Sequence, residues 1–322
     1  MKVLITGGAG FVGSNLVEFF VDGDYSSKIS EIRVLDKLTY AGSKSNLDSI
    51  TCFGEVQFIE GDICDLEIVK KAASGVDWIL NLAAESHVDR SVITPDIFFT
   101  TNILGTQNLL EVALRSNVQR FVQVSTDEVY GSISIGSFDE RSQLFPSSPY
   151  SASKASADLI ALSYFKTFGL NVCITRASNN FGKKQHPEKL IPQSVINLIS
   201  GNKIKLYGNG LNVRDWLHVK DHCKGIALAA EYGRAGEIYN LGGDFELTNL
   251  DLSREILNFL GLDEDWIEFV ADRPGHDFRY SIDSSKAKKE LMYEPKNSFF
   301  EVLHETIVWY RNNQDWWKNL ED

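Results

Sequence analysis

The first thirteen residues, MKVLITGGAGFVG, constrain this chain more than any other stretch. A strand pattern from Lys2 to Thr6 runs into three glycines, and an amphipathic helical pattern follows at once. Gly7 permits a tight turn, Gly10 lets the backbone approach a pyrophosphate, and Gly13 lets the helix pack on the strand. The N–H groups that begin such a helix also attract phosphates. This order of elements predicts a dinucleotide-binding site.

A second strand pattern, EIRVLD, ends at Asp36. A carboxylate at that point accepts hydrogen bonds from a ribose 2′-hydroxyl and repels a 2′-phosphate, which favours NAD over NADP. Lys37 is the opposing signal, because a cation beside Asp36 can receive the phosphate. The glycines alone would also suit a tight turn that binds no ligand, and Asp36 argues against that alternative.

Composition excludes several classes of protein. A length of 322 residues suggests two domains. No run approaches the roughly 18 apolar residues of a membrane span, and a glycine turn at residue 7 leaves no room for a signal peptide. Cysteines at 52, 64, 173 and 223 lack CxxC spacing, so we expect no disulfide framework and a reducing, cytoplasmic compartment. The net charge of −12 argues against a nucleic-acid partner.

We expect no metal site. His218 and His222 are one helical turn apart, which suits two ligands, but no third ligand lies near them in the sequence. We interpret His87 and His304 as structural residues.

Strand and helix patterns alternate through about residue 176. This alternation predicts an α/β fold, a Rossmann-like doubly wound parallel sheet. One helix is expected over residues 95–117, entered by Pro95, and one of its sides is predicted to hold Ile97, Phe98, Leu104, Leu109, Leu110 and Val112. Ligands bind beyond the carboxyl ends of such strands, here at the segments GDI, LAAES, STDEVYG and ASNNFG.

Beyond residue 178 the alternation weakens, and glycine-rich turns appear. The simplest division gives an NAD-binding domain over residues 1–178 that also includes about 213–241. A smaller mixed α/β domain over residues 179–322 would then bind the substrate.

Tyr150 and Lys154, in the segment YSASK, begin a predicted helix over residues 150–168. Residues four apart share a helix face, so the ammonium can lie near the phenol. A free tyrosine titrates near pH 10, and a neighbouring cation lowers that pKa toward the range of a useful base. The alternative is a surface Tyr–Lys pair. Downstream of a dinucleotide turn, we interpret the pair as catalytic.

Thr126, Asp127 and Glu128 stand where the strand pattern RFVQVST ends. Two adjacent carboxyls can be a solvated loop or a helix cap, but these lie at the edge of the sheet where cofactor-dependent chemistry is expected. Paired carboxyls in different environments provide one acid and one base. We therefore predict a catalytic role for the pair.

Along essentially its whole length the chain resembles the dTDP-glucose 4,6-dehydratases, which are extended short-chain dehydrogenase/reductases. The similarity rests on GGAGFVGS, DKLTYAG, LAAESHVDRS, STDEVYG, YSASK, NNFG with PEKLIP, GNGLNVRDWLHVKDH and DRPGHDFRY. The Asp-Glu pair is the most specific, since related GDP-mannose dehydratases have Ser before the Glu and 4-epimerases lack the pair. The chain departs from the family at Phe181, where Tyr is usual, and at residues 183–186, KKQH, where Pro and aromatics are usual.

The resemblance implies a mechanism for sugar dehydration. Tyr150, held by Lys154, takes the proton of the sugar O4 while NAD takes the C4 hydride, and Thr126 hydrogen-bonds the same oxygen. Glu128 then abstracts the C5 proton. Asp127, protonated, donates to the departing C6 hydroxyl, and the hydride returns to C6. The product is a 4-keto-6-deoxy sugar, an intermediate for L-rhamnose and other deoxysugars.

The resemblance also implies the binding residues. Those expected to contact NAD are Gly7, Gly10, Phe11, Val12, Gly13, Asp36, Lys37, Leu38, Thr39, Asp62, Ile63, Leu82, Ala83, Ala84, Thr101, Tyr150, Lys154 and Asn180. Those expected to bind the nucleotide-diphosphate hexose are Ser86, Thr126, Asn179, Lys189, Leu190, Lys205, Tyr207, Arg214, Asn249, Arg273 and His276. Arginine forks suit a diphosphate, although Arg214 also suits a structural pair with Asp215. A homodimer is implied too, with the helices at 95–117 and 150–168 in a four-helix seam.

Three alternatives stay open. A UDP-glucose 4,6-dehydratase would show the same catalytic residues, because thymine differs from uracil by one methyl, worth about 0.8 kcal/mol when buried. A sugar-nucleotide 4-epimerase shares the Tyr–Lys pair, but Asp127 and Glu128 argue against it. An NAD-sensing or scaffold protein would need none of these side chains.

Overall fold

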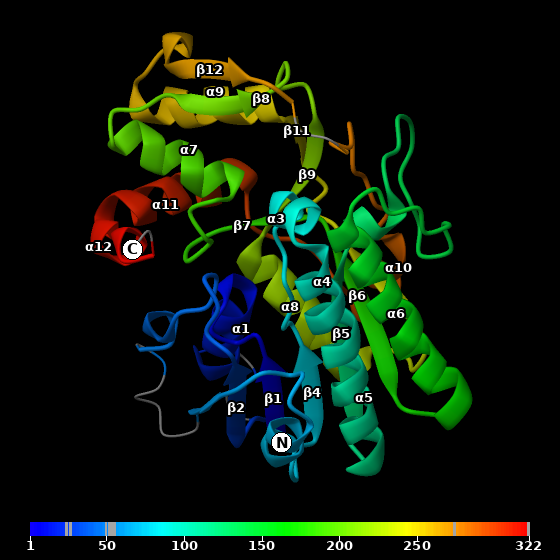
Figure 1. Cartoon of the computed structure of the whole chain (residues 1–322). Coiled ribbons are helices and arrows are strands. Elements are labelled where there is room, and N and C mark those ends of the chain that lie inside the picture. The colour runs from blue at the N-terminus through cyan, green and yellow to red at the C-terminus, as the bar shows by residue number, and fades with distance from the viewer. Residues whose placement is uncertain (23–24, 26–27, 49, 51–55, 273–274, 321–322) are drawn as a thin grey trace.

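A seven-stranded parallel sheet forms the centre of the computed structural model, which describes residues 1–22, 25, 28–48, 50, 56–272 and 275–320 (Figure 1). The strand order is β10-β6-β5-β4-β1-β2-β3. These strands are β1 (Lys2–Thr6), β2 (Glu31–Asp36), β3 (Val56–Glu60), β4 (Trp78–Asn81), β5 (Arg120–Thr126), β6 (Val172–Ala177) and β10 (Ile238–Leu241). Every pairing between them is parallel, so the predicted fold class is confirmed.

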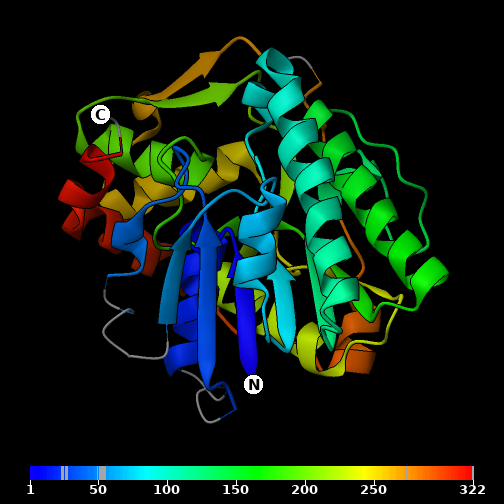
Figure 2. The ribbon, with the colours of Figure 1, turned by 60° about the horizontal axis from the view of Figure 1, so that its bottom comes forward.

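Helices cover both faces of the sheet, as Figures 1 and 2 show. Successive side chains of a strand point to opposite faces, and β1 accordingly sends Val3 and Ile5 into one core and Leu4 into the other. The first core contains residues of α1 (Phe11–Asp22), α8 (Val219–Tyr232) and α10 (Ser285–Leu291). The second contains residues of α2 (Leu66–Ala72), α5 (Thr106–Arg115) and α6 (Pro149–Phe168).

The predicted helix over residues 95–117 is not a regular α-helix. After α3 (Val88–Ile93), the chain forms α4 (Pro95–Phe99), a π-helical segment (Thr100–Gly105) and then α5. Phe98, Leu109, Leu110 and Val112 are buried, but Ile97 and Leu104, which were expected on the same side of the helix, are 44% and 53% exposed. A π-helical turn adds residues to the i→i+4 ladder, and a period of 3.6 therefore cannot be continued across it.

A smaller mixed region follows β6, and Figure 1 shows it beyond one end of the sheet. A three-stranded sheet in the order β11-β9-β7 joins β7 (Asn179–Phe181), β9 (Val213–His218) and β11 (Glu246–Thr248). A two-stranded parallel sheet pairs β8 (Ile204–Tyr207) with β12 (Ile267–Val270). The helices here are α7 (Leu190–Ile199), α9 (Asn249–Leu260), α11 (Phe299–Asn312) and α12 (Gln314–Lys318).

This region has its own core, which runs from Phe181 to Trp317 in the sequence. Short 3₁₀ helices lie at Lys44–Asn46, Asp127–Tyr130 and Glu264–Trp266. Within the part of the chain that the structure describes, no helix is both long and apolar enough to cross a membrane.

One ion pair is buried inside the fold. Arg176 of β6 donates from Nε to Asp158 of α6 at 2.9 Å, and the two side chains are 2% and 0% exposed. The guanidinium also lies 4.8 Å from the ring centroid of Tyr130. The pair thereby ties α6, which carries Tyr150 and Lys154, to the sheet beneath it.

We expect Asp158→Ala to lower the free energy of unfolding by about 3–5 kcal/mol, because it leaves the Arg176 guanidinium buried without its partner. Glu294→Ala, which breaks an exposed pair with Lys296, is the control and should cost less than about 1 kcal/mol. Chemical denaturation measures both. Equal losses for the two variants would contradict a special role for the buried pair.

Candidate active site

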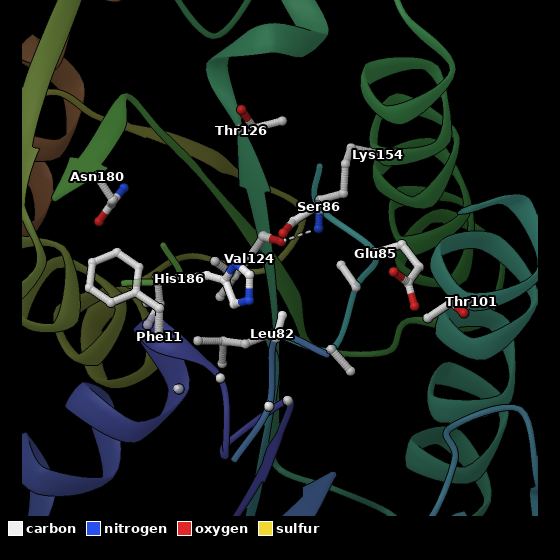
Figure 3. A pocket seen from close by; sticks show the side chains of 18 of the residues that line it. Phe11, Leu82, Glu85, Ser86, Thr101, Val124, Thr126, Lys154, Asn180 and His186 are labelled. Carbon is white, nitrogen blue, oxygen red and sulfur yellow. Dashed lines mark hydrogen bonds between the residues drawn. The ribbon is translucent and has the colours of Figure 1, made fainter. Parts of the chain in front are cut away.

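One cavity of about 310 Å³ collects most of the predicted site residues at the carboxyl ends of β1, β2, β4, β5 and β6 (Figure 3). The predicted residues that line it are Gly7, Gly10, Phe11, Val12, Gly13, Asp36, Lys37, Thr39, Asp62, Ile63, Leu82, Ala83, Ala84, Ser86, Thr101, Thr126, Asp127, Glu128, Tyr150, Lys154, Asn179, Asn180 and Lys189. Leu38 does not line it.

The three glycines of the turn have different roles. Gly7 and Gly13 allow close packing of the backbone, and Gly10 leaves space on the cavity side. Gly7 has a φ of +67°, and a Cβ on it would lie 2.7 Å from the backbone of Ala83. A Cβ on Gly13 would lie 2.2 Å from the carbonyl oxygen of Gly7, so α1 could not pack so closely with any larger residue. A Cβ on Gly10 would have one atom closer than 4 Å, the Gly7 oxygen at 3.3 Å, and Gly10 faces the cavity. These residues fit a dinucleotide pyrophosphate.

Asp36 connects the glycine turn to the loop that follows β2. Its two carboxylate oxygens accept hydrogen bonds of 2.9 Å from the backbone N–H of Ala9 and of Leu38. Burial raises the pKa of Asp36, and these two hydrogen bonds oppose that rise. Leu38 contributes its backbone rather than its side chain, and its φ of +55° turns the chain at this point.

Lys37 is surrounded by acceptors. Its ammonium lies 3.5 Å from Asp62 Oδ2 and 3.7 Å from Glu85 Oε1, and it donates to the Thr101 hydroxyl at 3.2 Å. Two carboxylates already compensate this charge, so the cation that argued for NADP in the sequence is not a free phosphate receptor. Glu85, which is 6% exposed, was not among the predicted residues.

The helix that carries Tyr150 and Lys154, α6, begins with residues that favour a helix N-terminus. Ser148 forms a capping box with Ser151, and Pro149 occupies the first turn. Lys154 donates from Nζ to the Val124 carbonyl oxygen at 2.6 Å (Figure 3). Burial lowers the pKa of Lys154 to about 8, while Asp158 acts to raise it.

The surroundings of Tyr150 oppose the lowering of its pKa that was expected from Lys154. Burial raises the pKa of Tyr150 above its usual value, and the charges of Glu128 and Asp127 raise it further, while the Thr126 side chain opposes the rise. Burial and the two acids therefore disfavour the phenolate at this position.

The acidic pair begins a 3₁₀ turn at the end of β5. Thr126 is its N-cap: the hydroxyl accepts from the Glu128 N–H at 3.2 Å and lies 3.3 Å from Asp127 Oδ1. Asp127 is 3% exposed, and its Oδ2 is buried without a hydrogen-bond partner in the described structure. Burial, and then the Glu128 charge, raise the pKa of Asp127 well above its usual range. Asp127 is therefore positioned as a proton donor.

Asn180 lines the same cavity and is held by two hydrogen bonds. Its Nδ2 donates to the Ser178 carbonyl, and its Oδ1 lies 2.8 Å from Nδ1 of His222. Burial lowers the pKa of His222 to about 3, so the ring is neutral and donates to Asn180. Among residues 1–22, 25, 28–48, 50, 56–272 and 275–320, no three metal-ligating side chains form a group that could hold a metal ion.

Several predicted substrate residues lie outside this cavity. Leu190 begins α7, Lys205 and Tyr207 are on β8, Asn249 begins α9, and His276 stands 6.1 Å from Tyr207, ring to ring. Arg214 on β9 donates to the carbonyl oxygens of Val213, Asp277 and Phe278. Both oxygens of Asp215 accept from the N–H groups of Gly243 and Phe245. Arg273 lies outside the described residues.

Part of the cavity lining was not predicted from the sequence, namely Glu85, Gln185, His186 and Glu188. Gln185 and His186 belong to the segment 183–186 that departs from the family pattern, whereas Glu85 and Glu188 lie in the matching segments LAAESHVDRS and PEKLIP. That departure was the signal available in the sequence for Gln185 and His186. The chemistry of the four side chains alone does not distinguish them from surface residues.

The fold and the cavity define a class: a short-chain dehydrogenase/reductase with a glycine turn for a dinucleotide, a Tyr–Lys pair and two acids. The chain belongs to the family described as GDP-mannose 4,6 dehydratase, which matches residues 4–306.

Individual relatives narrow the comparison. A dTDP-glucose 4,6-dehydratase of Actinoplanes sp. is 48% identical over 98% of this chain and 100% of that protein. One of Streptomyces antibioticus is 50% identical over 100% and 96%. The crystal structure of the dTDP-glucose 4,6-dehydratase of Streptomyces venezuelae, with NAD bound, is 51% identical, has a TM-score of 0.98, and covers 99% of this chain and 100% of its own. A UDP-glucose 4-epimerase of Thermotoga maritima reaches a TM-score of 0.89 at 28% identity, over 98% and 100%.

The raised pKa of Asp127 predicts that Asp127→Asn stabilises the protein increasingly as pH rises. The unfolded carboxyl ionises near pH 4, whereas the folded one keeps its proton, so folding takes up a proton above pH 4 and stability falls with rising pH. Asn is free of this cost. Thermal unfolding of Asp127→Asn and wild type at pH 5 and pH 8 should show the difference in stability growing between the two pH values. A pH-independent difference for Asp127→Asn would contradict the assignment.

Proposed function

We propose that this protein converts dTDP-glucose to dTDP-4-keto-6-deoxyglucose through C4 oxidation, loss of water across C5–C6 and return of hydride to C6. The observation that carries the proposal is the meeting of Asp127, Glu128 and Tyr150 in one cavity with a dinucleotide turn. An oxidation needs a cofactor and a base, whereas an elimination needs an additional acid and base. The chain brings all of these together.

NAD, when bound, supplies the hydride acceptor for C4 and the hydride donor for C6, and its oxidised ring carries a positive charge that favours the Tyr150 phenolate. Gly7, Gly10 and Gly13 would hold its pyrophosphate, and Asp36 its ribose. Lys37, compensated by Asp62 and Glu85, supports NAD over NADP.

Tyr150 is proposed to take the proton of the sugar O4. Lys154, anchored on the Val124 carbonyl, lies one helical turn along α6 and adds positive charge on that side of the phenol. Thr126 presents its hydroxyl to the same region and would hydrogen-bond O4.

The two acids are proposed to perform the elimination. The C4 ketone acidifies the C5 proton, which Glu128 removes as a carboxylate. Asp127, kept protonated by burial, gives its proton to the C6 hydroxyl, which leaves as water. The elimination leaves a C5–C6 double bond, and when hydride returns to C6, Glu128, which now carries a proton, protonates C5. The different burial of the two neighbours supports the division into acid and base.

Two further proposals concern the architecture. The cofactor domain is proposed to comprise residues 1–178 with about 213–241, which is supported by β10 in the large sheet and α8 in its core, although β9 pairs with β7 and β11. The remainder of 179–322 is proposed to bind the sugar nucleotide, with the predicted residues of β8, α9 and the 273–276 segment on the nucleotide side.

A homodimer through the helices of residues 95–117 and 150–168 is also proposed. Support comes from the exposed apolar side chains of Ile97, Leu104 and Leu159, at 44%, 53% and 58% exposure. Such side chains on neighbouring helices suit burial against a second copy.

A cytoplasmic location is proposed as well, supported by the free thiols of Cys64, Cys173 and Cys223.

The nucleotide is tested with a panel of dTDP-, UDP- and GDP-hexoses followed by mass spectrometry. We expect loss of water from dTDP-glucose at the highest kcat/KM. A higher value with UDP-glucose would favour the UDP-glucose 4,6-dehydratase, and change of configuration without mass loss would favour the 4-epimerase. No conversion of any sugar nucleotide would favour a sensor or scaffold.

Tyr150→Phe should lower turnover by at least about 10², because the base for C4 oxidation is lost. Only a hydroxyl is removed, so folding and NAD binding should be retained. Tyr232→Phe, at a half-exposed tyrosine, is the matched control and should keep wild-type turnover. Near-normal turnover of Tyr150→Phe would mean that another group takes the O4 proton.

Glu128→Gln should oxidise C4 but stop before elimination, because no carboxylate removes the C5 proton. Reduced cofactor should then accumulate, visible as near-ultraviolet absorbance, without release of water. Glu301→Gln, at an exposed glutamate of α11, should behave like wild type. Normal dehydration by Glu128→Gln would assign the C5 proton to another base.

A further inference from the structure

The segment of residues 182–189 joins β7 to α7 and forms part of the cavity wall. Gln185, His186, Glu188 and Lys189 all line the cavity. Lys189 donates from Nζ to the Ser86 carbonyl oxygen at 3.1 Å, across the cavity lining. The same segment contains the residues, KKQH, that depart from the family pattern.

Two lysines of this segment bind α1, the helix that begins at the glycine turn. Lys183 forms an ion pair with Glu18, and Lys184 Nζ lies 3.3 Å from the other oxygen of the same carboxylate. The Asn15 side chain adds a hydrogen bond of 3.2 Å to the Lys183 carbonyl oxygen. The segment is therefore fixed to the cofactor helix by charge and by hydrogen bonds.

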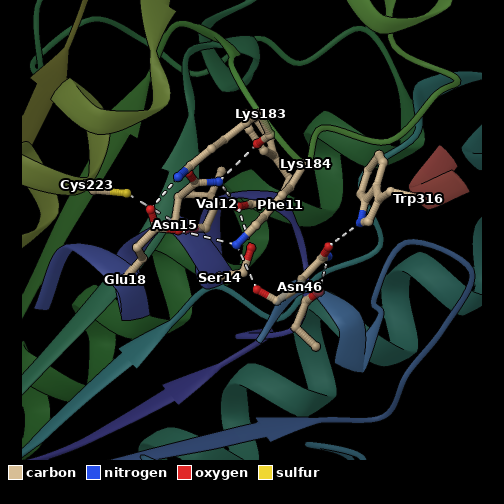
Figure 4. A network of polar contacts seen from close by, with 11 residues as sticks. Phe11, Val12, Ser14, Asn15, Glu18, Asn46, Lys183, Lys184, Cys223 and Trp316 are labelled. Atoms are coloured by element: carbon tan, nitrogen blue, oxygen red, sulfur yellow. Dashed lines mark hydrogen bonds and ion pairs between the residues drawn. The ribbon is translucent and has the colours of Figure 1, made fainter. Parts of the chain in front are cut away.

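Asn46 connects these contacts to the glycine turn itself (Figure 4). Lys184 donates from Nζ to the Asn46 carbonyl oxygen at 2.8 Å. The Asn46 side chain donates to the Ala9 carbonyl oxygen at 2.8 Å and accepts from Trp316 Nε1 of α12 at 2.8 Å. Asn46 is 2% exposed, so four separate stretches of the chain meet at a buried amide.

The backbone of Lys184 indicates that these contacts are strong. Its φ is +67°, in the left-handed region, which is unfavourable for a residue other than glycine. Such a conformation persists only where the surrounding contacts stabilise it. Its side chain is 11% exposed, so the ammonium is largely removed from water and depends on Glu18 and Asn46. The strain and burial fall on a residue next to the cavity wall.

We propose that Lys183, Lys184, Glu18 and Asn46 form a clasp that holds segment 182–189 against the cofactor cavity and slows the release of NAD. Lys183 and Lys184 are positioning residues in this account and do not touch the reacting atoms. The inference rests on the proposed function, because a hydride taken from C4 reaches C6 only if the same cofactor molecule stays bound between the two steps.

The test measures NAD release from the holoenzyme in the absence of sugar nucleotide. Protein loaded with radiolabelled NAD is diluted into excess unlabelled NAD, and retained label is followed by filter binding. Lys184→Met and Glu18→Gln should each release label about tenfold faster, the factor that about 1.4 kcal/mol represents. Lys203→Met, at an exposed lysine between α7 and β8, is the matched control and should release label at the wild-type rate.

A purely structural role is separated by varying the charge at residue 18. Glu18→Asp keeps the carboxylate that both lysines contact and should release label more slowly than Glu18→Gln, whereas Glu18→Lys puts a third cation beside Lys183 and Lys184 and should release label faster than Glu18→Gln. If Lys184→Met does not fold, Lys183→Met, at a side chain 29% exposed, replaces it. Unchanged release in folded clasp variants would overturn the clasp. Since no turnover is measured, loss of the clasp and loss of the dehydratase function are distinguishable outcomes.

Discussion

The close approach of α1 to β1 is the constraint on which the cofactor side of this structure depends. A Cβ at residue 13 would lie 2.2 Å from the Gly7 carbonyl oxygen, so the helix reaches this position only because that side chain is absent. The approach brings the start of α1 to the same sheet edge as β4 and β5. Asp36 and Asn46 then hold the neighbouring loops to the turn through Ala9, whose N–H and carbonyl they bind.

Burial sets the direction of the pKa shifts at the proposed reaction site. It lowers the pKa of Lys154, raises that of Tyr150 and raises that of Asp127. In the proposed mechanism, the first two shifts disfavour the charged forms that C4 oxidation uses, and the third favours the protonated acid that elimination uses.

Local sequence patterns predicted the strands of the large sheet. They also predicted where the site lies, because a parallel sheet places the carboxyl ends of its strands together. The segment at 95–117 was expected as one helix with its apolar residues on one side, but a π-helical turn breaks the 3.6 period, and Ile97 and Leu104 are exposed while Phe98 and Leu109 are buried. Glu85 and Glu188 were missed because their place in the cavity depends on tertiary contacts with Lys37 and Arg90. The rise in the pKa of Tyr150 could not be predicted from the sequence, because its causes, burial and the charges of two acids, arise from tertiary packing.

The movement of one hydrogen isotope tests the central claim most directly. When dTDP-glucose deuterated at C4 is incubated with the enzyme, the account predicts product with that deuterium at C6, and reaction in D₂O should place solvent deuterium at C5. Both positions are resolved by NMR and mass spectrometry. Deuterium returned to C4, or absent from C6, would contradict a 4,6-dehydratase mechanism in which one cofactor takes and returns the hydride.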